Sequence, residues 1–222
     1  MRVDIWSDLV CPWCYVGKRR FEGALARFEG REAVRIVHHS FQLNPAAPND
    51  GTSDRRDMLM RKYRLTPRQV EDMDLRMTQT AVAEGLDFHL EGTVTGNTAA
   101  AHQLVHLAAD HGLQDTMIER LYRAYFVEQA SIFDHDALVV LADGTGVDPA
   151  EAAAALRDER YAAAVARDLD AARRLGITGV PFFVIDERLG VSGAQSPDVF
   201  LDALRRAATE QLDVQPEGTT AP

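Results

Sequence analysis

Apolar residues recur with two different periods in this chain, and the change of period divides it into three parts. Arg2–Trp6 alternates apolar and polar residues and ends at a turn signal, which predicts a strand. Tyr15–Phe28 carries apolar residues at helical spacing, and the apolar, β-branched run within Ala33–Leu43 predicts a second strand. The first part therefore predicts a β-α-β unit.

The middle part, from Ala46 to about Ala172, is rich in Ala, Arg, Leu and Glu and predicts a block of helices. Thr66 and Gln69 have the spacing of a capping box, with Pro67 at the first helical position. Further helix starts are predicted at the cap signals Asn97-Thr98, Asp134 and Asp148-Pro149.

The last part returns to strands. Phe182–Ile185 and Arg188–Val191 predict two strands joined by a tight turn. Ser196 opens a final amphipathic helix that runs to about Gln211.

This order of elements predicts an α/β fold that is interrupted by a helical insertion. Residues 1–45 and 173–212 are expected to close into one discontinuous domain, and residues 46–172 to form an inserted all-helical domain. Residues 213–222 contain Pro, Gly and Thr and predict a disordered tail.

The composition is that of an ordinary globular protein with an acidic surface. Apolar residues make up 46% of the 222 and charged residues 26%, which excludes wholesale disorder. Lys and Arg number 24 against 34 Asp and Glu, and the net charge of −10 argues against nucleic acid and anionic membranes as partners. No apolar stretch reaches membrane-spanning length and residues 1–8 lack the apolar run of an export signal, so we expect a cytoplasmic protein.

The two cysteines of the chain, Cys11 and Cys14, lie in a Cys-Pro-Trp-Cys motif at the predicted junction of the first strand and helix. Free amide groups and the helix dipole favour a thiolate at such a junction, so Cys11 is the expected nucleophile. Cys14 lies three residues further along the helix, close enough to form a small disulfide ring, and is the expected resolving thiol. A Cys-x-x-Cys pair beside a β-α-β pattern therefore predicts thiol–disulfide exchange.

Three simpler interpretations compete with redox chemistry: half of a zinc site, a structural bridge, and two unrelated thiols. Zinc takes four ligands and the sequence has no second cysteine pair, while a bridge that closes so short a loop gains little entropy. The redox pair is the preferred interpretation, and no metal is predicted.

A second motif, Gly179-Val180-Pro181-Phe182, directly precedes the returning strand. Proline cannot donate a hydrogen bond into a sheet, so Pro181 is either an edge residue or the site of a cis bond. Together the two motifs resemble the thioredoxin-like DsbA family with its helical insertion, specifically the FrnE-like cytoplasmic branch, over nearly the full chain. The segments that carry the resemblance are Ser7–Lys18, Phe41–Pro45, Thr95–Thr98 with Ala101-His102, Gly179–Phe183 and Ser192–Gln195.

The resemblance implies a binding groove beside the cysteines. It implies that Pro181 is cis and faces the motif, and that the backbone of Val180 pairs with a bound peptide or glutathione strand. Pro12 and Trp13, between the cysteines, are expected to bind substrate together with Val180 and Pro181. The resemblance also implies no tightly bound cofactor, glutathione as a candidate co-substrate, protein or small-molecule disulfides and thiols as partners, and a monomer or homodimer. Glu128–Ser131 lacks the Gly-Arg-Asp expected of the branch, which leaves substrate specificity open.

For the histidines, a structural role is preferred over a functional one. His102 and His106 are four residues apart on a predicted helix, a spacing that suits a metal, but no third ligand accompanies them. A polar helix face is therefore preferred, with His102 facing the active-site cleft as the alternative. Alternation places His38 and His39 on opposite faces of the second strand.

Structural roles are also preferred for Asp8, for Trp6 and for a group of four methionines. Asp8 is interpreted as a helix cap, with tuning of Cys14 as the alternative. Trp6 is expected in the core. Ordinary packing is preferred over a binding surface for the methionines Met58, Met60, Met73 and Met77.

The preferred function is a cytoplasmic thiol–disulfide oxidoreductase or isomerase that acts on protein or small-thiol disulfides. The alternative enzyme is a glutathione-dependent isomerase or transferase of the 2-hydroxychromene-2-carboxylate isomerase or kappa type, acting on a small aromatic or polyketide substrate. Those relatives carry Ser where this chain has Cys11, which favours redox chemistry. A third hypothesis is a chaperone-like binding module in which the cysteines are incidental.

The motif also predicts a moderate redox potential. The strongly oxidising periplasmic relatives have His between the cysteines, whereas the uncharged Trp13 stabilises a thiolate less. Equilibration with glutathione is expected to place the Cys11–Cys14 pair at a potential more negative than the about −120 mV of DsbA. A value at or above that potential would contradict the interpretation.

Overall fold

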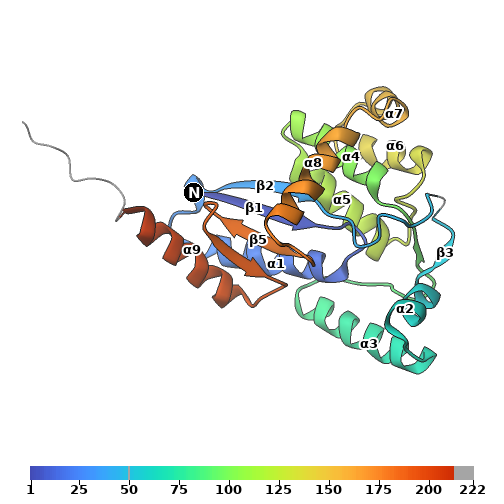
Figure 1. Cartoon of the computed structure of the whole chain (residues 1–222), viewed down its shortest axis with the longest axis horizontal. Coiled ribbons are helices and arrows are strands. Elements are labelled where there is room, and N and C mark those ends of the chain that lie inside the picture. The colour runs from blue at the N-terminus through green and yellow to red at the C-terminus, as the bar shows by residue number, and fades with distance from the viewer. Residues whose placement is uncertain (50, 213–222) are drawn as a thin grey trace, which may run out of the picture.

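The computed structural model describes residues 1–49 and 51–212, in which a four-stranded sheet lies among helices (Figure 1). The strands of this sheet are β1 (Arg2–Ser7), β2 (Arg35–Ser40), β5 (Phe182–Ile185) and β6 (Leu189–Ser192). The helices are α1 (Pro12–Ala26), α2 (Arg55–Tyr63), α3 (Pro67–Ala83), α4 (Ala99–Asp110), α5 (Gln114–Phe126), α6 (His135–Asp143), α7 (Pro149–Arg157), α8 (Ala162–Arg174) and α9 (Pro197–Leu212), with a 3-10 turn at Arg31–Ala33. The predicted tail, residues 213–222, lies outside the described residues.

The sheet joins the two ends of the chain. Its strand order is β2-β1-β5-β6, with β1 parallel to β2 and the other neighbouring pairs antiparallel. Val3 of β1 pairs with Ile36 on one side and with Ile185 on the other. The predicted thioredoxin-like fold, a β-α-β unit that closes with a β-β-α unit, is confirmed.

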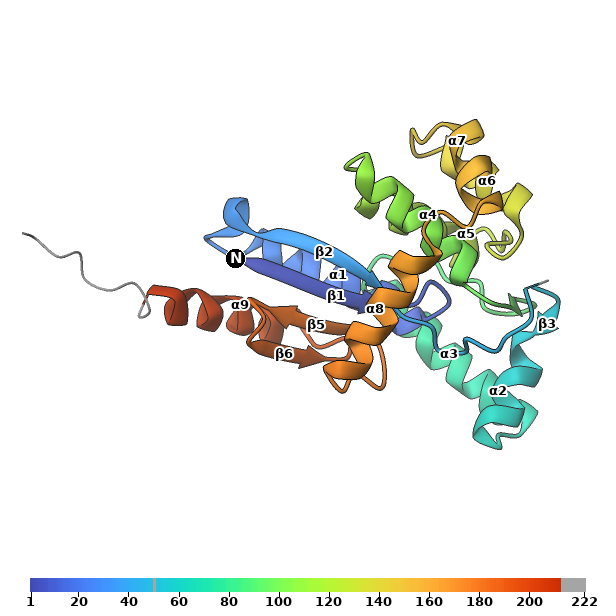
Figure 2. The same cartoon turned by 45° about the horizontal axis from the view of Figure 1, so that its top comes forward.

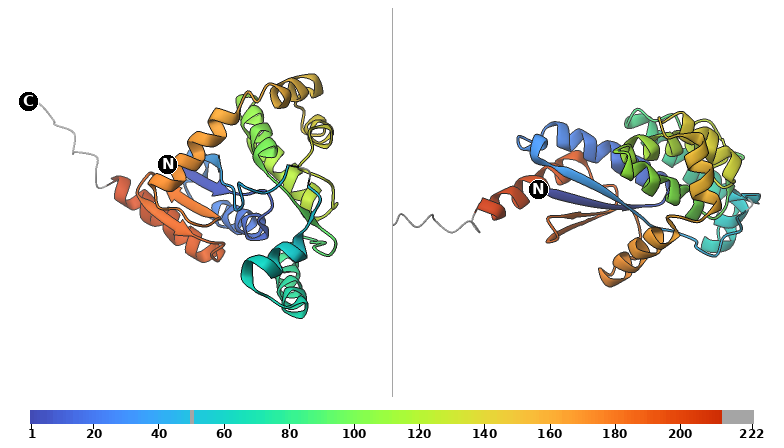
Figure 3. Two further views of the ribbon diagram at one scale, coloured as in Figure 1. Left: turned by 45° about the vertical axis from the view of Figure 1, so that its right-hand side comes forward. Right: turned by 90° about the horizontal axis from the view of Figure 1, so that it is seen from above.

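Helices cover both faces of this sheet. Figures 2 and 3 show α8 on one face and α1 and α9 on the other. The core beneath α1 and α9 contains Val3, Ile5, Phe21, Phe183 and Phe200, with the rings of Phe183 and Phe200 only 4.5 Å apart. The alternating residues of β1 therefore bury one side under α1, which fixes the direction in which α1 leaves the sheet.

The insertion packs against the start of α1 rather than standing apart from it. Figure 1 shows α2 and α3 on one side of the start of α1 and α4–α7 on the other. Leu9, Cys11, Cys14, Tyr15 and Val16 belong to the same buried cluster as the insertion helices. The cysteine motif therefore lies where the sheet-forming part meets the insertion.

The insertion largely follows its sequence signals. The capping box of Thr66 and Gln69 is present, and Asp134 and Asp148 cap their helices. A short ribbon that the sequence does not predict pairs β3 (Ser53–Asp54) with β4 (Val94–Thr95). α8 runs across residue 172, and the division of the chain into two domains stays a prediction. Among the described helices, none is long and apolar enough to cross a membrane.

A buried ionic network joins α8 to the sheet. His39 of β2 lies between two carboxylates, with Nδ1 2.8 Å from Asp168 and Nε2 2.6 Å from Asp4. A neutral imidazole has one N–H, so contacts with two carboxylates favour the doubly protonated ring. The ring also stacks on Trp6 at 4.3 Å, and Asp168 accepts a further hydrogen bond from the amide of Ser40.

Replacing the carboxylate that His39 and His106 share tests how much this network contributes to the free energy of unfolding. Asp168→Asn leaves His39 and His106 without their common partner, and loss of one member of a buried ion pair costs about 3 kcal/mol of unfolding free energy. Asp170→Asn is the matched control on the same helix, because Asp170 is half exposed and pairs with Arg173. Urea denaturation near neutral pH should show the large loss in the first variant and less than about 0.5 kcal/mol in the control. Equal losses of unfolding free energy in the two variants would show that the buried network stabilises the fold no more than the exposed ion pair does.

The network also predicts a pH dependence of stability. Burial lowers the pKa of His39, but its hydrogen bonds to Asp168 and Asp4 outweigh burial and raise the pKa overall. Burial raises the pKa of Asp168, but hydrogen bonds from His106 and His39 outweigh burial and lower that pKa overall. The aspartate contribution is complete above the unfolded pKa of about 3.9 and is lost as the pH falls through the lowered value. The histidine contribution is complete below the unfolded pKa of about 6.5 and is lost as the pH rises through the raised value.

The free energy of unfolding should therefore fall as the pH rises above about 6.5, by at most about 1.4 kcal/mol per pH unit for one proton. His39→Gln removes the titrating ring and should flatten this fall. Urea denaturation at several pH values from about 5 to about 9 measures it. An identical pH profile for the variant and the wild type would contradict the assignment.

Candidate active site

The Cys-Pro-Trp-Cys motif lies where β1 gives way to α1. β1 ends at Ser7 and α1 begins at Pro12, so Cys11 is the N-cap residue, with extended backbone angles. No side chain caps this helix, and the amide of Cys11 donates to the carbonyl oxygen of Asp8 at 3.1 Å. The interpretation of Asp8 as a helix cap is wrong, because its carboxylate accepts from the amide of Leu43 instead, at 2.8 Å.

The two thiols of the motif face different surroundings. Cys11 and Cys14 are free and only 3.4 Å apart. Cys11 lines a cavity, whereas Cys14, 2% exposed, does not line it and packs in the core. Burial raises the pKa of Cys14 well above its ordinary value, and the adjacent Cys11 raises it further. Access from the cavity is therefore to the sulfur of Cys11.

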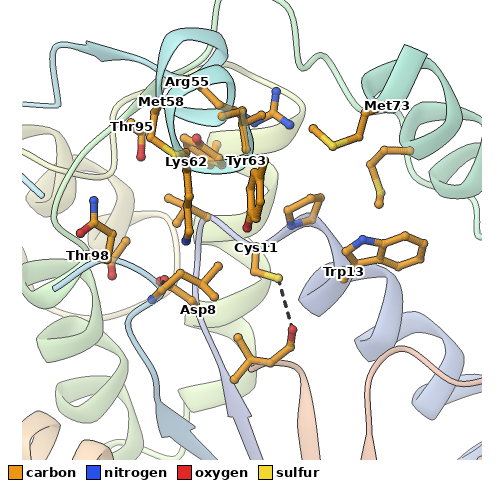
Figure 4. Close-up of a pocket in the computed structure, with 18 of the residues that line it drawn as sticks. Asp8, Cys11, Trp13, Arg55, Met58, Lys62, Tyr63, Met73, Thr95 and Thr98 are labelled. Carbon is orange, nitrogen blue, oxygen red and sulfur yellow. Dashed lines mark hydrogen bonds between the residues drawn. The ribbon is translucent and has the colours of Figure 1, made fainter. Parts of the chain in front are cut away.

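The loop before β5 faces this sulfur. The Val180–Pro181 peptide bond is cis, as the resemblance predicts. The Sγ of Cys11 donates to the carbonyl oxygen of Val180 at 3.6 Å, along the dashed line in Figure 4. Gly17 allows the loop to approach α1, since a Cβ at this position would lie 2.9 Å from Cγ of Pro181. Sequence reasoning gave Gly17 no role, although it lies within the segment that carries the resemblance.

A cavity of about 350 Å³ opens beside Cys11. Pro12, Trp13 and Val180 line it near the sulfur, whereas Pro181, the fourth predicted binding residue, is not among the lining residues. Trp13 is 46% exposed at this site. The opposite wall comes from α2 and α3 and contains Met58, Leu59, Lys62, Tyr63, Met73 and Met77 (Figure 4).

Three of the four methionines considered in the sequence analysis line this cavity. Met58, Met73 and Met77 line the cavity, whereas Met60 does not. Their unbranched thioether side chains adapt to apolar groups of different shape. Met77 also packs in the buried core, in agreement with the preferred interpretation, and the alternative of a binding surface stays a prediction for the three lining residues.

Four charged residues also line the cavity. Arg55 and Asp74 form a two-bond ion pair with N–O distances of 2.8 and 2.9 Å, so their charges offset each other. Asp8 is 1% exposed, and its Oδ1 has no hydrogen-bond partner. Lys62 reaches in from α2 on the opposite wall (Figure 4).

The predicted histidines lie outside the cavity. His102 packs behind Asp8, with Nε2 3.4 Å from Oδ1 of Asp8 and 3.0 Å from the carbonyl oxygen of Phe41. His106 instead contacts Asp168 at 3.0 Å, so the two histidines serve separate carboxylates. Within residues 1–49 and 51–212, no three His, Cys, Asp or Glu side chains cluster in a way that could hold a metal.

The strand histidines diverge as alternation predicts. His38 lies 3.3 Å from Asp115 of α5, whereas His39 faces Asp168 of α8.

Tyr122, a buried residue of α5, is a neighbour of the cysteine motif. Burial raises the pKa of Tyr122, and the charge of Cys14 raises it further. Sequence reasoning missed this neighbour of the motif, because more than a hundred residues separate it from Cys14.

Solved structures of other proteins resemble this fold. The chain is 41% identical to a probable DsbA oxidoreductase of Streptomyces coelicolor, with a TM-score of 0.93 over 100% of this chain and 99% of that one. The cytosolic disulfide reductase DsbM of Pseudomonas aeruginosa has a TM-score of 0.65 at 23% identity, over 97% of this chain and 100% of that one. A 2-hydroxychromene-2-carboxylate isomerase has a TM-score of 0.72 at 13% identity, over 97% and 100% of the two chains. The last two similarities show a shared fold alone.

A family model accounts for nearly the whole described chain. Residues 2–205 match the DSBA-like thioredoxin domain. The match includes the β-α-β unit, the helical insertion, the cis-proline loop and most of α9. The chain therefore belongs to the family of DSBA-like thioredoxin domains.

Proposed function

We propose that this protein is a thiol–disulfide oxidoreductase in which Cys11 attacks the substrate and Cys14 resolves the intermediate. The main observation that supports this proposal is the different placement of the two cysteines. Cys11 faces a cavity and the Val180 carbonyl, whereas Cys14 lies 3.4 Å away on the buried side. Exchange through a mixed disulfide needs one accessible sulfur and one protected sulfur within bonding reach.

The reductive half-reaction balances with the two thiols alone. The Cys11 thiolate attacks one sulfur of a substrate disulfide, whose S–S bond breaks, releasing one thiolate and leaving a mixed disulfide on Cys11. Cys14 then loses its proton and attacks Sγ of Cys11, which releases the second thiolate and forms the Cys11–Cys14 disulfide. Two electrons pass to the substrate. Cys11 gives its proton to solvent when its thiolate forms and Cys14 gives up its proton in the second step, and the two released thiolates take up two protons in return. Two equivalents of a monothiol return the pair to the dithiol by the reverse exchange.

Burial of Cys14 orders these steps. Burial and the adjacent Cys11 raise the pKa of Cys14, so this thiol stays protonated in the reduced pair and is a poor nucleophile there. This arrangement supports Cys11 as the first nucleophile.

Substrate binding is assigned to the residues around the sulfur. The backbone of Val180 borders Cys11 and is placed to pair with an extended chain, while Pro12 and Trp13 offer apolar contact. Glutathione is a candidate co-substrate, and a related fold, that of DsbM, has been solved with it. Protein or small-molecule disulfides as partners, action in the cytoplasm, a monomeric or dimeric state and independence of metal belong to the same proposal.

The glutathione-dependent isomerase or transferase remains the competing enzyme. Its support is the shared fold with 2-hydroxychromene-2-carboxylate isomerase. That chemistry needs a thiol-binding site and no second sulfur, whereas this chain places two free thiols 3.4 Å apart. The pair therefore favours redox exchange, also over a chaperone-like module that would use neither sulfur.

Substitution of the cysteines separates these functions. Cys14→Ala should accumulate a stable mixed disulfide at Cys11 when treated with oxidised glutathione, because the resolving sulfur is gone. The wild type should instead form the Cys11–Cys14 disulfide, and Cys11→Ser should form neither product. Intact mass and peptide mapping distinguish the three results.

The rate at which each protein reduces insulin disulfides, with a thiol as electron donor, tests the activity itself. Cys11→Ser should fall to the uncatalysed rate. Equal rates in the wild type, Cys11→Ser and Cys14→Ala would end the oxidoreductase proposal. Suppression of aggregation that survives both substitutions would favour the chaperone-like module.

A further inference from the structure

Arg20 of α1 binds two segments that are far apart in the sequence. Its Nε donates to Oε1 of Glu84 at 2.6 Å, and its Nη1 donates to the carbonyl oxygen of Ala194 at 2.7 Å. Glu84 is the C-cap residue of α3, and Ala194 lies in the loop between β6 and α9. The side chains of Arg20 and Glu84 are only 21% and 19% exposed, so their ion pair is largely shielded from solvent ions. Arg20 therefore joins α1, α3 and the loop after β6.

The loop after β6 supports the cis-proline loop. The amide of Gly193 donates to the carbonyl oxygen of Pro181 at 2.8 Å. Pro181 and Ala194 also pack on the same spot of α1, since a Cβ on Gly17 would lie 2.9 Å from Cγ of Pro181 and 3.4 Å from Cβ of Ala194. The guanidinium contact with the Ala194 carbonyl therefore supports the wall of the cavity that carries Val180.

The contact with Glu84 holds the end of α3. Met73 and Met77 of this helix line the cavity on the side opposite Val180, and Figure 4 shows Met73 projecting from α3 into the cavity. The ion pairs of Asp74 and Glu71 connect α3 to α2, whereas that of Glu84 connects α3 to α1. Because α1 carries the cysteine motif, the Glu84 contact helps to fix where the methionine wall stands relative to the reactive sulfur.

The spacing of these two walls matters because thiol–disulfide exchange depends on alignment. The attacking thiolate approaches along the axis of the S–S bond that breaks, so the three sulfurs must lie nearly in line. A misplacement of about 1 Å in such a geometry can cost about a hundredfold in rate. Arginine suits the task of fixing two walls, since its planar guanidinium holds two acceptors at a set angle, whereas the ammonium of lysine is a single point charge.

On the basis of the proposed exchange chemistry, we propose that Arg20 is a positioning residue of this active site. It binds Glu84 and the carbonyl of Ala194 at once, sets the spacing between the two walls, and thereby aligns the substrate disulfide with Cys11. Arg20 does not line the cavity, so it acts through the walls and not on the sulfurs directly. It exchanges no proton or electron with the substrate.

Comparison of two reactions of the reduced protein tests this role. Exchange is measured as loss of protein thiols to oxidised glutathione, whose disulfide must align between the walls. Alkylation of Cys11 by iodoacetamide needs only access to a thiolate. Arg20→Met should lower the ratio of the exchange rate constant to the alkylation rate constant by about tenfold, with Cys14 still protected from iodoacetamide. Arg20→Lys should also lower the ratio, because it keeps the charge without the planar pair of donors.

Further variants locate the effect. Glu84→Gln weakens one contact and should lower the ratio by about threefold, and in combination with Arg20→Met it should cause no further loss, because the two residues act through one interaction. Arg19→Met is the matched control. Arg19 precedes Arg20, is similarly buried and also pairs with a carboxylate of the insertion, Glu119, but this carboxylate belongs to α5. The control should keep the wild-type ratio although it removes an ion pair of the same kind.

The outcomes separate this inference from the function on which it rests. No exchange by the wild type would overturn the exchange chemistry and the inference with it. An unchanged ratio in Arg20→Met, or an equal fall in Arg19→Met, would overturn the positioning role alone. Rapid alkylation of Cys14 in native Arg20→Met would show that Arg20 supports the fold as a whole, and would overturn that role too. Should Arg20→Met fail to fold, an unchanged ratio in Glu84→Gln decides against the role.

Discussion

The active site depends on the unequal access of two cysteines to one cavity at the first turn of α1. Both cysteines are nearly hidden, yet Cys11 borders a cavity and Cys14 packs in the core. Burial raises the pKa of Cys14, so the second thiol stays protonated while the first meets the substrate. The order of the exchange steps follows from this difference in surroundings.

Two parts of the fold hold the sulfurs in this arrangement. The sheet core beneath α1 fixes the axis of the helix, and the insertion core surrounds its first turn. Tyr15 belongs to this second contact, since its ring stacks on Tyr122 and its hydroxyl donates to Glu119 at 2.6 Å. The ion pairs of His39 with Asp4 and Asp168 tie α8 to the sheet on its other face. The insertion thereby supplies both the seal over Cys14 and, through α2 and α3, the wall of the cavity.

Local signals made much of this predictable from the sequence. The strand and helix periods and the position of Pro181 before a strand each involve neighbouring residues, and these predictions were confirmed. The cysteine spacing brings Cys11 and Cys14 within 3.4 Å of each other, and their redox role stays a proposal. Pairings between distant residues carry no such signal. The contact of His39 with Asp168 spans 129 residues, and the carboxylate of Asp8 turns to Leu43, 35 residues away, rather than to its own helix.

Three further features escaped prediction for the same physical reason. The two-residue strands of the ribbon are too short to show a period. The methionine spacing places Met73 and Met77 on one helix face, but whether a cavity or a neighbour covers that face depends on where α2 lies. Gly17 is ordinary in a sequence and becomes informative only when Pro181 is found against it.

The most direct test of this account is the rate at which each cysteine of the reduced native protein is alkylated. A short pulse of iodoacetamide at neutral pH, followed by denaturation, labelling of the remaining thiols with a heavy reagent and peptide mass spectrometry, gives the modified fraction of each residue. Cys11 should be alkylated first, with Cys14 protected until the protein unfolds. Faster alkylation of Cys14, or an inert Cys11, would contradict the division of roles between the two sulfurs.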